Sequence, residues 1–296
     1  MDQKIGVIGF GTMASGMVKN LLNNKYTVVC YNRTKQKLNA IKQANFIAVD
    51  TPADAAKQAH IIVLCVSDDA ALENVLFGEK GIMNSITPEH TLIDCSTTSL
   101  LMTEKIQLAC VTRNAFFVDA PVTGSKLGAE GGSLLFMVGG EEKILEKVMH
   151  VFMAMGKKVI YCGENTFGQR AKLALNLTQA LIFESYCEGL LFAMKNGIKK
   201  ETMLEILDNS GAKNNVMSFK MPYLLKNEFE PHFKLDLMKK DILLCYDELK
   251  RLHLTFPLSQ QILSVYKKAN KEGLGELDYT ATIKILENIA GVRLVQ

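Results

Sequence analysis

A glycine-rich turn near the N-terminus has residue types and spacing that suit a dinucleotide. Residues 9–14 read Gly-Phe-Gly-Thr-Met-Ala and match the pattern G-x-G-x-x-A, between a strand-like run and a helix-like run. In such a turn Gly9 permits the tight bend, Gly11 lets the backbone approach a pyrophosphate, and Ala14 keeps the helix close to the strand. The N–H groups at the helix start then face the phosphates. The residues expected to contact the dinucleotide here are Gly9, Phe10, Gly11, Thr12 and Met13.

The end of the second predicted strand indicates which dinucleotide is preferred. Sites for NAD usually carry Asp or Glu about 20 residues after the glycines, where it accepts a hydrogen bond from the ribose 2′-OH. This chain has Asn32-Arg33-Thr34 instead, so no carboxylate would repel a 2′-phosphate. Arg33 offers a planar, charged fork that suits phosphate, and Thr34 adds a hydroxyl donor. A solvated arginine at a strand end is the alternative, but the position of Arg33 in the motif favours NADP(H) over NAD(H).

A lysine and an asparagine one helical turn apart form a second candidate centre. Lys172 and Asn176 are four residues apart and therefore share one face of a helix. A helical lysine is normally solvated. Here Leu173, Leu175 and Leu177 make the surroundings apolar, and burial would lower the pKa of Lys172 toward the range of a general acid–base.

A loop of small and hydroxyl-bearing residues, Asp119–Ser125, forms the third candidate centre. It reads Asp-Ala-Pro-Val-Thr-Gly-Ser and follows a strand-like run. Its hydroxyls and backbone N–H groups could hold a substrate carboxylate. A plain surface turn would have the same composition, so the loop alone leaves both interpretations open.

The first half of the chain alternates short apolar strands with helices. Ile61–Val66 is typical of a buried parallel strand, and Leu100–Val111 is helical in spacing. Thr34 is expected to cap a helix Lys35–Ala44, and Thr51-Pro52 reads as a cap followed by proline at the first helical position. Strands separated by helices indicate βαβ units and a Rossmann-type, doubly wound sheet.

The pattern changes near Gly163. Long helical segments follow, beginning with Gly168–Lys195, and no convincing strand occurs before the last few residues. The chain is therefore expected to belong to the α/β class, with an all-α C-terminal domain. We predict an NADP-binding Rossmann domain at residues 1–163 and a domain for substrate binding and oligomerisation at residues 164–296.

Composition excludes several classes of protein. The 296 residues suffice for one large or two ordinary domains, and 48% apolar with 22% charged residues is typical of a globular chain. The net charge of +3 gives no basic footprint for nucleic acid, and no stretch is apolar enough to span a bilayer. The 7 cysteines form no C-x-x-C pair, and the histidines are scattered. We expect reduced thiols, no metal site and, without a signal-peptide pattern, a cytoplasmic location.

Four segments together resemble the β-hydroxyacid dehydrogenase family. Gly9–Asn20, Asp119–Ser125, Gly168–Asn176 and Lys240-Asp241 occur there in this order and at this spacing, and the match runs over essentially the whole chain. The family includes 3-hydroxyisobutyrate dehydrogenase, tartronate semialdehyde reductase and NADPH-dependent glyoxylate/succinic semialdehyde reductases. The triplet at 32–34 and the stretch Thr123–Lys126 are most similar to the last of these branches.

The resemblance implies a role for each matching residue. Lys172 would give a proton to the carbonyl oxygen as hydride arrives, and Asn176 would orient the lysine or the substrate. The residues implied to hold the substrate are Thr123, Gly124 and Ser125, which would bind its carboxylate, and Phe233, which would line its pocket. The residues implied to contact the cofactor, besides the glycine turn, are Asn32, Arg33, Thr34, Val66, Ser67, Thr97 and Lys240.

Several positions depart from the family's commonest pattern. Thr123 stands where Ser is frequent, Ser125 replaces a frequent Gly, and Leu175 stands where many relatives have a second Asn. These departures leave the lysine in place, but they weaken an assignment to 3-hydroxyisobutyrate in particular.

The resemblance therefore implies an NADP(H)-dependent oxidoreductase that interconverts a small 3-hydroxy acid and its semialdehyde, with Lys172 as general acid–base. An imine reductase is one rival, but those relatives usually lack the lysine. A catalytically silent scaffold protein is another, and such relatives tend to lack the lysine and to carry extra modules. A phosphogluconate-type dehydrogenase is disfavoured by the short C-terminal half.

The expected partners are a small carboxylate-bearing aldehyde or hydroxy acid and further copies of the chain. Few charges lie along much of Gly168–Lys195, which suits burial between domains or subunits. The family commonly forms dimers or tetramers, so a homodimer or homotetramer is expected. Neither nucleic acid nor membrane is expected as a partner.

Overall fold

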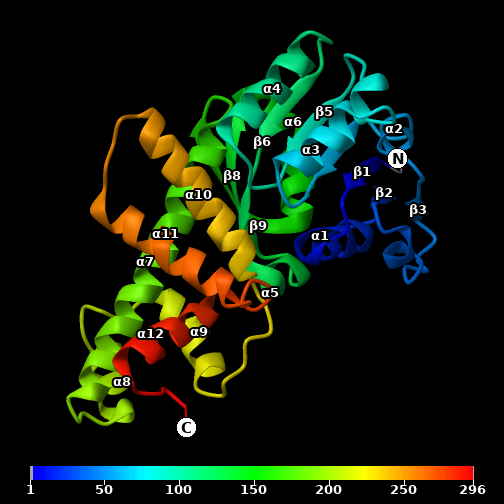
Figure 1. Ribbon diagram of the computed structural model, residues 1–296. Helices are drawn as coiled ribbons and strands as arrows, with labels where there is room; N and C mark the ends of the chain where they lie inside the picture. The colour runs from blue at the N-terminus through cyan, green and yellow to red at the C-terminus, as the bar shows by residue number, and fades with distance from the viewer. Residues whose placement is uncertain (1–2, 296) are drawn as a thin grey trace. The chain divides into compact units, whose positions relative to one another are not determined.

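The computed structural model describes residues 3–295, and the chain divides into two compact units, Met1–Lys172 and Leu173–Gln296. The division falls within one long helix, α7 (Phe167–Lys195), whose first turns belong to the first unit. Figure 1 shows the chain coloured along its length, with α7 in green. Each unit has a hydrophobic core of its own.

The first unit is built on one mixed sheet, in which the described residues form nine strands. Their order in space is β3-β2-β1-β4-β5-β6-β8-β7, with β9 paired to β8. The pairs from β3 to β6 are parallel, whereas β8 runs antiparallel to β6 and β7. The order reverses between β1 and β4, and doubly wound sheets bind ligands at such a switch point. The predicted Rossmann-type sheet is thus confirmed. The strands are β1 (Lys4–Ile8), β2 (Thr27–Tyr31), β3 (Phe46–Ala48), β4 (Ile61–Leu64), β5 (Thr91–Asp94), β6 (Phe116–Asp119), β7 (Val122–Thr123), β8 (Leu134–Gly140) and β9 (Gly156–Gly163).

Side-chain caps set where several helices of the first unit begin. Thr51 accepts a backbone N–H three residues on at 3.1 Å, and Pro52 takes the first helical position, as predicted. Ser99 caps α4 by accepting the N–H of Met102 at 3.0 Å. The helices of this unit before α7 are α1 (Thr12–Asn23), η1 (Lys35–Leu38), α2 (Pro52–Ala56), α3 (Asp69–Phe77), η2 (Ile82–Asn84), α4 (Leu100–Val111), α5 (Ser125–Glu130) and α6 (Glu142–Met155).

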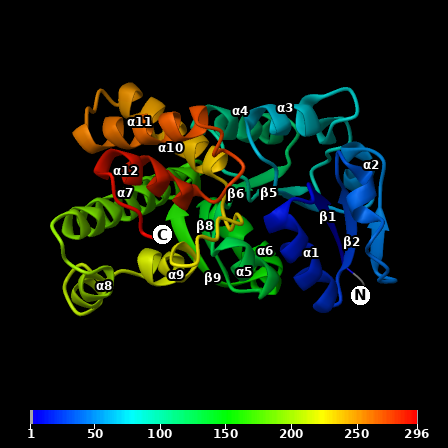
Figure 2. The ribbon, with the colours of Figure 1, turned by 60° about the horizontal axis from the view of Figure 1, so that its bottom comes forward.

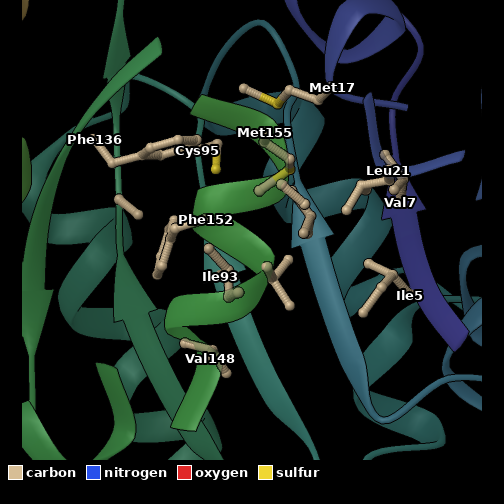
Figure 3. Packing of buried hydrophobic residues seen from close by; sticks show 14 of the residues in the cluster. Ile5, Val7, Met17, Leu21, Ile93, Cys95, Phe136, Val148, Phe152 and Met155 are labelled. Carbon is tan, nitrogen blue, oxygen red and sulfur yellow. The ribbon is translucent and has the colours of Figure 1, made fainter. Parts of the chain in front are cut away.

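Helices cover both faces of this sheet (Figure 2). On one face, α1 and α6 pack on Val7 and Ile93 of the central strands, and on the other face α2, α3 and α4 pack on Leu64. Figure 3 shows the first of these cores from close by. In it the rings of Phe136 and Phe152 meet edge to face, with centroids 4.9 Å apart. Burial on both faces explains why these strands read as continuous apolar runs.

Two stretches of the first unit differ from the sequence prediction. The predicted helix Lys35–Ala44 is wrong, because the segment forms only the 3₁₀ helix Lys35–Leu38 and then turns toward β3. Its well-buried side chain is Leu38, which is 2% exposed, and Ile41 is only partly buried against the same core, so little apolar burial is available to hold a longer helix together. The second stretch, residues 120–163, contains β7, β8, β9, α5 and α6, which were not predicted.

The second unit is helical, as predicted. Outside the isolated bridge between Lys234 and Asp278, its described residues contain no strand. Side chains of α7, α10 and α11 meet in its core, among them Phe183, Met238 and Tyr266. The helices after α7 are α8 (Lys200–Asp208), α9 (Asn215–Leu224), α10 (Leu235–Arg251), α11 (Pro257–Lys271), η3 (Tyr279–Thr282) and α12 (Ile283–Ala290).

Among residues 3–295 no helix has the length and apolar character needed to cross a membrane. In the same range, His, Cys, Asp and Glu side chains form no group of three that could hold a metal ion.

Candidate dinucleotide and catalytic site

Gly9 and Gly11, between β1 and α1, are glycines for different reasons. Gly9 has a φ of +101°, and a Cβ there would lie 2.3 Å from the carbonyl oxygen of Cys65, so the protein's own packing requires glycine. Gly11 has a φ of −81°, which any residue can adopt. A Cβ on Gly11 would meet no heavy atom of the described residues within 4 Å. The space beside Gly11 therefore suits close approach by a bound pyrophosphate.

The start of α1 has the electrostatics of an anion site. Gly11 is its N-cap and has no side chain to satisfy the first N–H groups of the helix. The described first turn contains no acidic residue, and Thr12 is exposed. The helix dipole adds partial positive charge at this end. Ala14, at the third small position of the motif, is fully buried, as expected for a residue between helix and strand.

Asn32 links the glycine turn to the end of β2. Its Oδ1 accepts the backbone N–H of Phe10 at 3.0 Å, and its Nδ2 donates to the carbonyl oxygen of Thr34 at 2.8 Å. Both Arg33 and Thr34 are exposed. Asn32 therefore shapes the turn that presents the guanidinium of Arg33, whose fork of donors suits a phosphate.

The carboxyl ends of β4 and β5 lie next to the glycine turn in the sheet order. The backbone N–H of Val66 donates to Ser96 Oγ at 3.0 Å, which joins the loops after these two strands. Ser67 is exposed and Thr97 is half-buried. The sheet thus brings Val66, Ser67 and Thr97 to the edge that carries the glycine turn.

The predicted carboxylate loop is more ordered than a plain turn. Thr123 belongs to β7, which pairs with β8, and α5 begins at Ser125. Gly124 and Ser125 have φ values of +139° and +61°. Glycine adopts positive φ without steric cost. The φ of +61° at Ser125 therefore gives a physical reason why Gly is frequent at this position in the β-hydroxyacid dehydrogenase family, which the sequence resembles.

Lys172 lies on α7 and is 7% exposed, so the burial expected from its leucine neighbours is observed. The start of its helix is held by Asp119, the last residue of β6. The Asp119 carboxylate accepts the backbone N–H groups of Thr166 and Gln169, each at 2.8 Å. Asp119 is fully buried, and this burial raises its pKa to about 6.

In the second unit, an aspartate that was not among the predicted site residues joins two that were. Asp241, 1% exposed on α10, accepts a hydrogen bond from Asn176 Nδ2 at 2.6 Å. Its other carboxylate oxygen lies 2.9 Å from Lys240 Nζ. The pair Lys240-Asp241 in the sequence was the available signal, but a contact between residues 65 positions apart needs the fold to reveal it.

Phe233 is fixed by its backbone in the same unit. Its N–H donates to Asp278 Oδ2 at 3.1 Å, and its ring lies edge to face with Tyr279, with centroids 6.4 Å apart. Asp278 also forms a buried ion pair with Lys220, at 2.8 Å. Desolvation lowers the pKa of Lys220, and the carboxylate of Asp278 opposes that effect.

Family models match most of the chain. Residues 4–163 match the NAD binding domain of 6-phosphogluconate dehydrogenase. Residues 167–286 match the NAD-binding domain of NADP-dependent 3-hydroxyisobutyrate dehydrogenase.

Individual relatives match over nearly their whole length. The chain is 30% identical to glyoxylate/succinic semialdehyde reductase 1 of Arabidopsis thaliana, over 96% of this chain and 98% of the relative. It is also 30% identical to 2-(hydroxymethyl)glutarate dehydrogenase of Eubacterium barkeri, over 98% and 96%. Its fold is similar to that of Mycobacterium tuberculosis 3-hydroxyisobutyrate dehydrogenase with L-serine, with a TM-score of 0.87, 24% identity and coverage of 97% and 99%. The chain belongs to the β-hydroxyacid dehydrogenase family of NAD(P)-dependent oxidoreductases.

Proposed function

We propose that the protein is an NADP(H)-dependent oxidoreductase that interconverts a small 3-hydroxy acid and its semialdehyde. Its activity would be of the 3-hydroxyisobutyrate dehydrogenase or the glyoxylate/succinic semialdehyde reductase type. The observation that carries this proposal is a lysine, Lys172, buried to 7% exposure on α7 in a chain of this family. Residues 1–163 would hold the cofactor, and residues 164–296 would serve substrate binding and oligomerisation.

The proposed chemistry assigns the proton to Lys172. In the reductive direction its ammonium gives a proton to the carbonyl oxygen of the aldehyde, and in the oxidative direction its neutral amine takes the proton back. Bound NADPH would supply the hydride that reduces the carbonyl carbon. Asn176, one turn further along α7, orients the lysine or the substrate, and Asp241 fixes the Asn176 amide through their 2.6 Å hydrogen bond.

Substrate selection is assigned to the loop after β6. The hydroxyls of Thr123 and Ser125 and the backbone N–H of Gly124 hold the substrate carboxylate, because such a loop offers several donors to one anion. Phe233 lines the pocket with an apolar ring. Lys240 contacts the cofactor.

Preference for NADP(H) rests on the exposed Arg33 and Thr34, with no carboxylate in the 32–34 triplet. Steady-state kinetics with NADPH and NADH test this part, and a higher kcat/KM for NADPH is the expected result. Arg33→Ala should raise KM for NADPH much more than KM for NADH, because the smaller cofactor lacks the 2′-phosphate. A clear preference of the unmodified protein for NADH would contradict the assignment.

A panel of substrates tests the reaction itself. NADPH oxidation is followed with glyoxylate, succinic semialdehyde, methylmalonate semialdehyde and tartronate semialdehyde, and with a cyclic imine. Turnover of at least one of the carboxylate-bearing aldehydes is expected, with little or none of the imine. Turnover of the imine alone would favour the imine reductase alternative, and cofactor binding without any turnover would favour a silent scaffold.

Two further expectations belong to the whole protein. We propose a homodimer or homotetramer, which size-exclusion chromatography with light scattering would distinguish from a monomer. A cytoplasmic location is also proposed, and fractionation of cells would test it.

A further inference from the structure

Gln169 is a buried side chain at the start of α7 whose amide is hydrogen-bonded at both ends. It is 0% exposed. Its Nε2 donates to the carbonyl oxygen of Ser96 at 2.8 Å, and its Oε1 accepts the backbone N–H of Thr98 at 3.3 Å. Its own backbone N–H donates to Asp119 Oδ2 at 2.8 Å. Gln169 therefore joins α7 to the loop after β5 and to the last residue of β6.

The orientation of the Gln169 amide follows from its partners. A backbone carbonyl can only accept and a backbone N–H can only donate, so the amide nitrogen must face Ser96 and the amide oxygen must face Thr98. These two residues flank Thr97, one of the residues that the family resemblance implies to contact the cofactor. Gln169 also lies three positions before Lys172, on the same face of α7.

We infer that Gln169 is a positioning residue, which fixes the loop Ser96–Thr98 against the turn of α7 that carries Lys172. The inference rests on the proposed roles of Lys172 and Thr97. Hydride transfer and proton transfer to one carbonyl group require the nicotinamide and the lysine at a set separation. A misplacement of about 1 Å can cost about 10²-fold in rate. The two hydrogen bonds of the Gln169 amide, to Ser96 and Thr98, would prevent such a shift.

The loop Ser96–Thr98, which Gln169 contacts, is also hydrogen-bonded to the ends of β4 and β5. Ser96 Oγ accepts the N–H of Val66, and the N–H of Ser96 donates to Asp94 Oδ1 at 2.9 Å. Loss of the Gln169 bridge therefore frees α7 from a loop that remains tied to the sheet. The expected defect is in the placement of Lys172 relative to the cofactor loop, and cofactor affinity should change less.

Two substitutions separate positioning from general packing. Gln169→Leu replaces the amide with an apolar side chain of similar size and removes both hydrogen bonds. Gln169→Glu keeps the shape, but an ionised carboxylate cannot donate to Ser96. When protonated, the same carboxyl can donate to Ser96 and accept from Thr98, as the amide does. Gln261→Glu, the same change at an exposed position on α11, is the matched control.

The charged surroundings bear on the titration of the introduced carboxyl. Asp94 and Asp119 belong to the same network and favour its protonated form, as burial does, whereas Lys172 favours its ionised form. The thiols of Cys65 and Cys95 interact with Asp94, and that of Cys162 interacts with Asp119. Because these groups are present in every variant, the rate of each variant is divided by the rate of the unmodified protein at the same pH.

The activity experiment measures kcat, KM and NADPH Kd between pH 5.5 and 8.5. Gln169→Leu should lower kcat by about 10²-fold at every pH while NADPH Kd changes by less than about threefold. Gln169→Glu should show the same loss at pH 8.5, and its ratio should recover as the pH falls. A ratio for Gln169→Glu that is flat with pH, or a near-normal kcat for Gln169→Leu, would overturn the inference.

A readout without cofactor or turnover accompanies the kinetics. Hydrogen exchange by mass spectrometry of a peptide covering residues 95–103 reports the Thr98 amide in the protein alone. Gln169→Leu should speed its exchange by about tenfold, whereas Gln261→Glu should leave it unchanged. Failure of the proposed function is recognised separately, by the absence of turnover across the aldehyde panel or by near-normal turnover in Lys172→Ala, and neither result changes the exchange of the Thr98 amide. Loss of turnover in Lys172→Ala together with normal Gln169 variants rejects the positioning role alone.

Discussion

At the scale of single residues, the glycine turn separates what the fold needs from what a ligand needs. Gly9 is forced by its positive φ and by the carbonyl oxygen of Cys65. At Gly11 the conformation is ordinary and the neighbouring space is open. The motif alone cannot distinguish a glycine required by the fold from one required by the ligand, because both positions are glycine in the sequence. The structure therefore allows two different outcomes to be predicted for the same substitution.

Gly11→Ala should leave the melting temperature nearly unchanged, because its Cβ meets no described atom, and should weaken NADPH binding, because the Cβ enters the space of the pyrophosphate. Gly9→Ala should destabilise the protein. Fluorescence titration with NADPH and thermal unfolding measure the two effects. Gly189→Ala, on an exposed and open position of α7, is the control and should bind NADPH normally. Normal NADPH affinity in Gly11→Ala would contradict the placement of the cofactor.

Glu184 predicts a pH dependence of stability in the second unit. It is 6% exposed, and burial raises its pKa from 4.5 to about 7. The pKa of Glu184 is higher in the folded protein than in the unfolded chain, so the folded protein binds more protons between pH 4.5 and 7. The free energy of unfolding therefore falls as the pH rises from about 4.5 through 7. Glu184→Gln should therefore be more stable than the unmodified protein at pH 8, by up to about 3–4 kcal/mol if each pKa unit is worth about 1.4 kcal/mol.

Urea unfolding at several pH values measures this difference. The advantage of Glu184→Gln should shrink as the pH falls toward 4.5. Glu205→Gln, at an exposed position of α8 in the same unit, should show no comparable trend. An advantage of Glu184→Gln that is independent of pH would show that packing, and not titration, sets the effect.

At the scale of elements, local signals fix where helices start and distant partners fix where strands pair. The capped start of α4 illustrates the first point. Ser99→Ala removes the acceptor for the N–H of Met102 and should lower the free energy of unfolding by about 1 kcal/mol. Chemical denaturation measures the loss. Ser99→Asp replaces one good cap with another and should retain most of the stability, so equal losses in both variants would argue against capping.

Elements with strong local signals could be predicted from the sequence. Leu100–Val111 begins and ends as predicted, and Thr51 caps α2. The helix predicted from Lys35 to Ala44 failed because its periodicity had almost nothing to pack against. β8 was missed because its pairing depends on β6, β7 and β9, which no local pattern specifies.

The candidate site follows the same division. The four-residue spacing of Lys172 and Asn176 on one helix face is visible in the sequence, and the family resemblance assigned both residues to the site. Asp241, which bonds to Asn176, was not singled out because that contact spans 65 positions. Gln169 was likewise missed, since its partners lie 71 and 73 positions away.

At the scale of the whole molecule, the fold of the family places the glycine turn at the carboxyl edge of the sheet and a buried lysine, Lys172, on α7. Membership of the β-hydroxyacid dehydrogenase family is shown by matches over both halves of the chain. The sheet order brings the glycine turn together with the loops after β4 and β5. Proton transfer from Lys172 to the carbonyl oxygen distinguishes the proposed dehydrogenase from an imine reductase or a silent scaffold, because those two would share the fold without that step.

The most direct test compares the unmodified protein with Lys172→Ala, using the best aldehyde of the panel and NADPH. Lys195→Ala, at an exposed position at the end of α7, is the control and should turn over normally. Lys172→Ala should bind NADPH with unchanged Kd and lower kcat by roughly 10²–10⁴-fold, the usual cost of losing a general acid–base. Turnover by Lys172→Ala close to that of the unmodified protein would contradict the account.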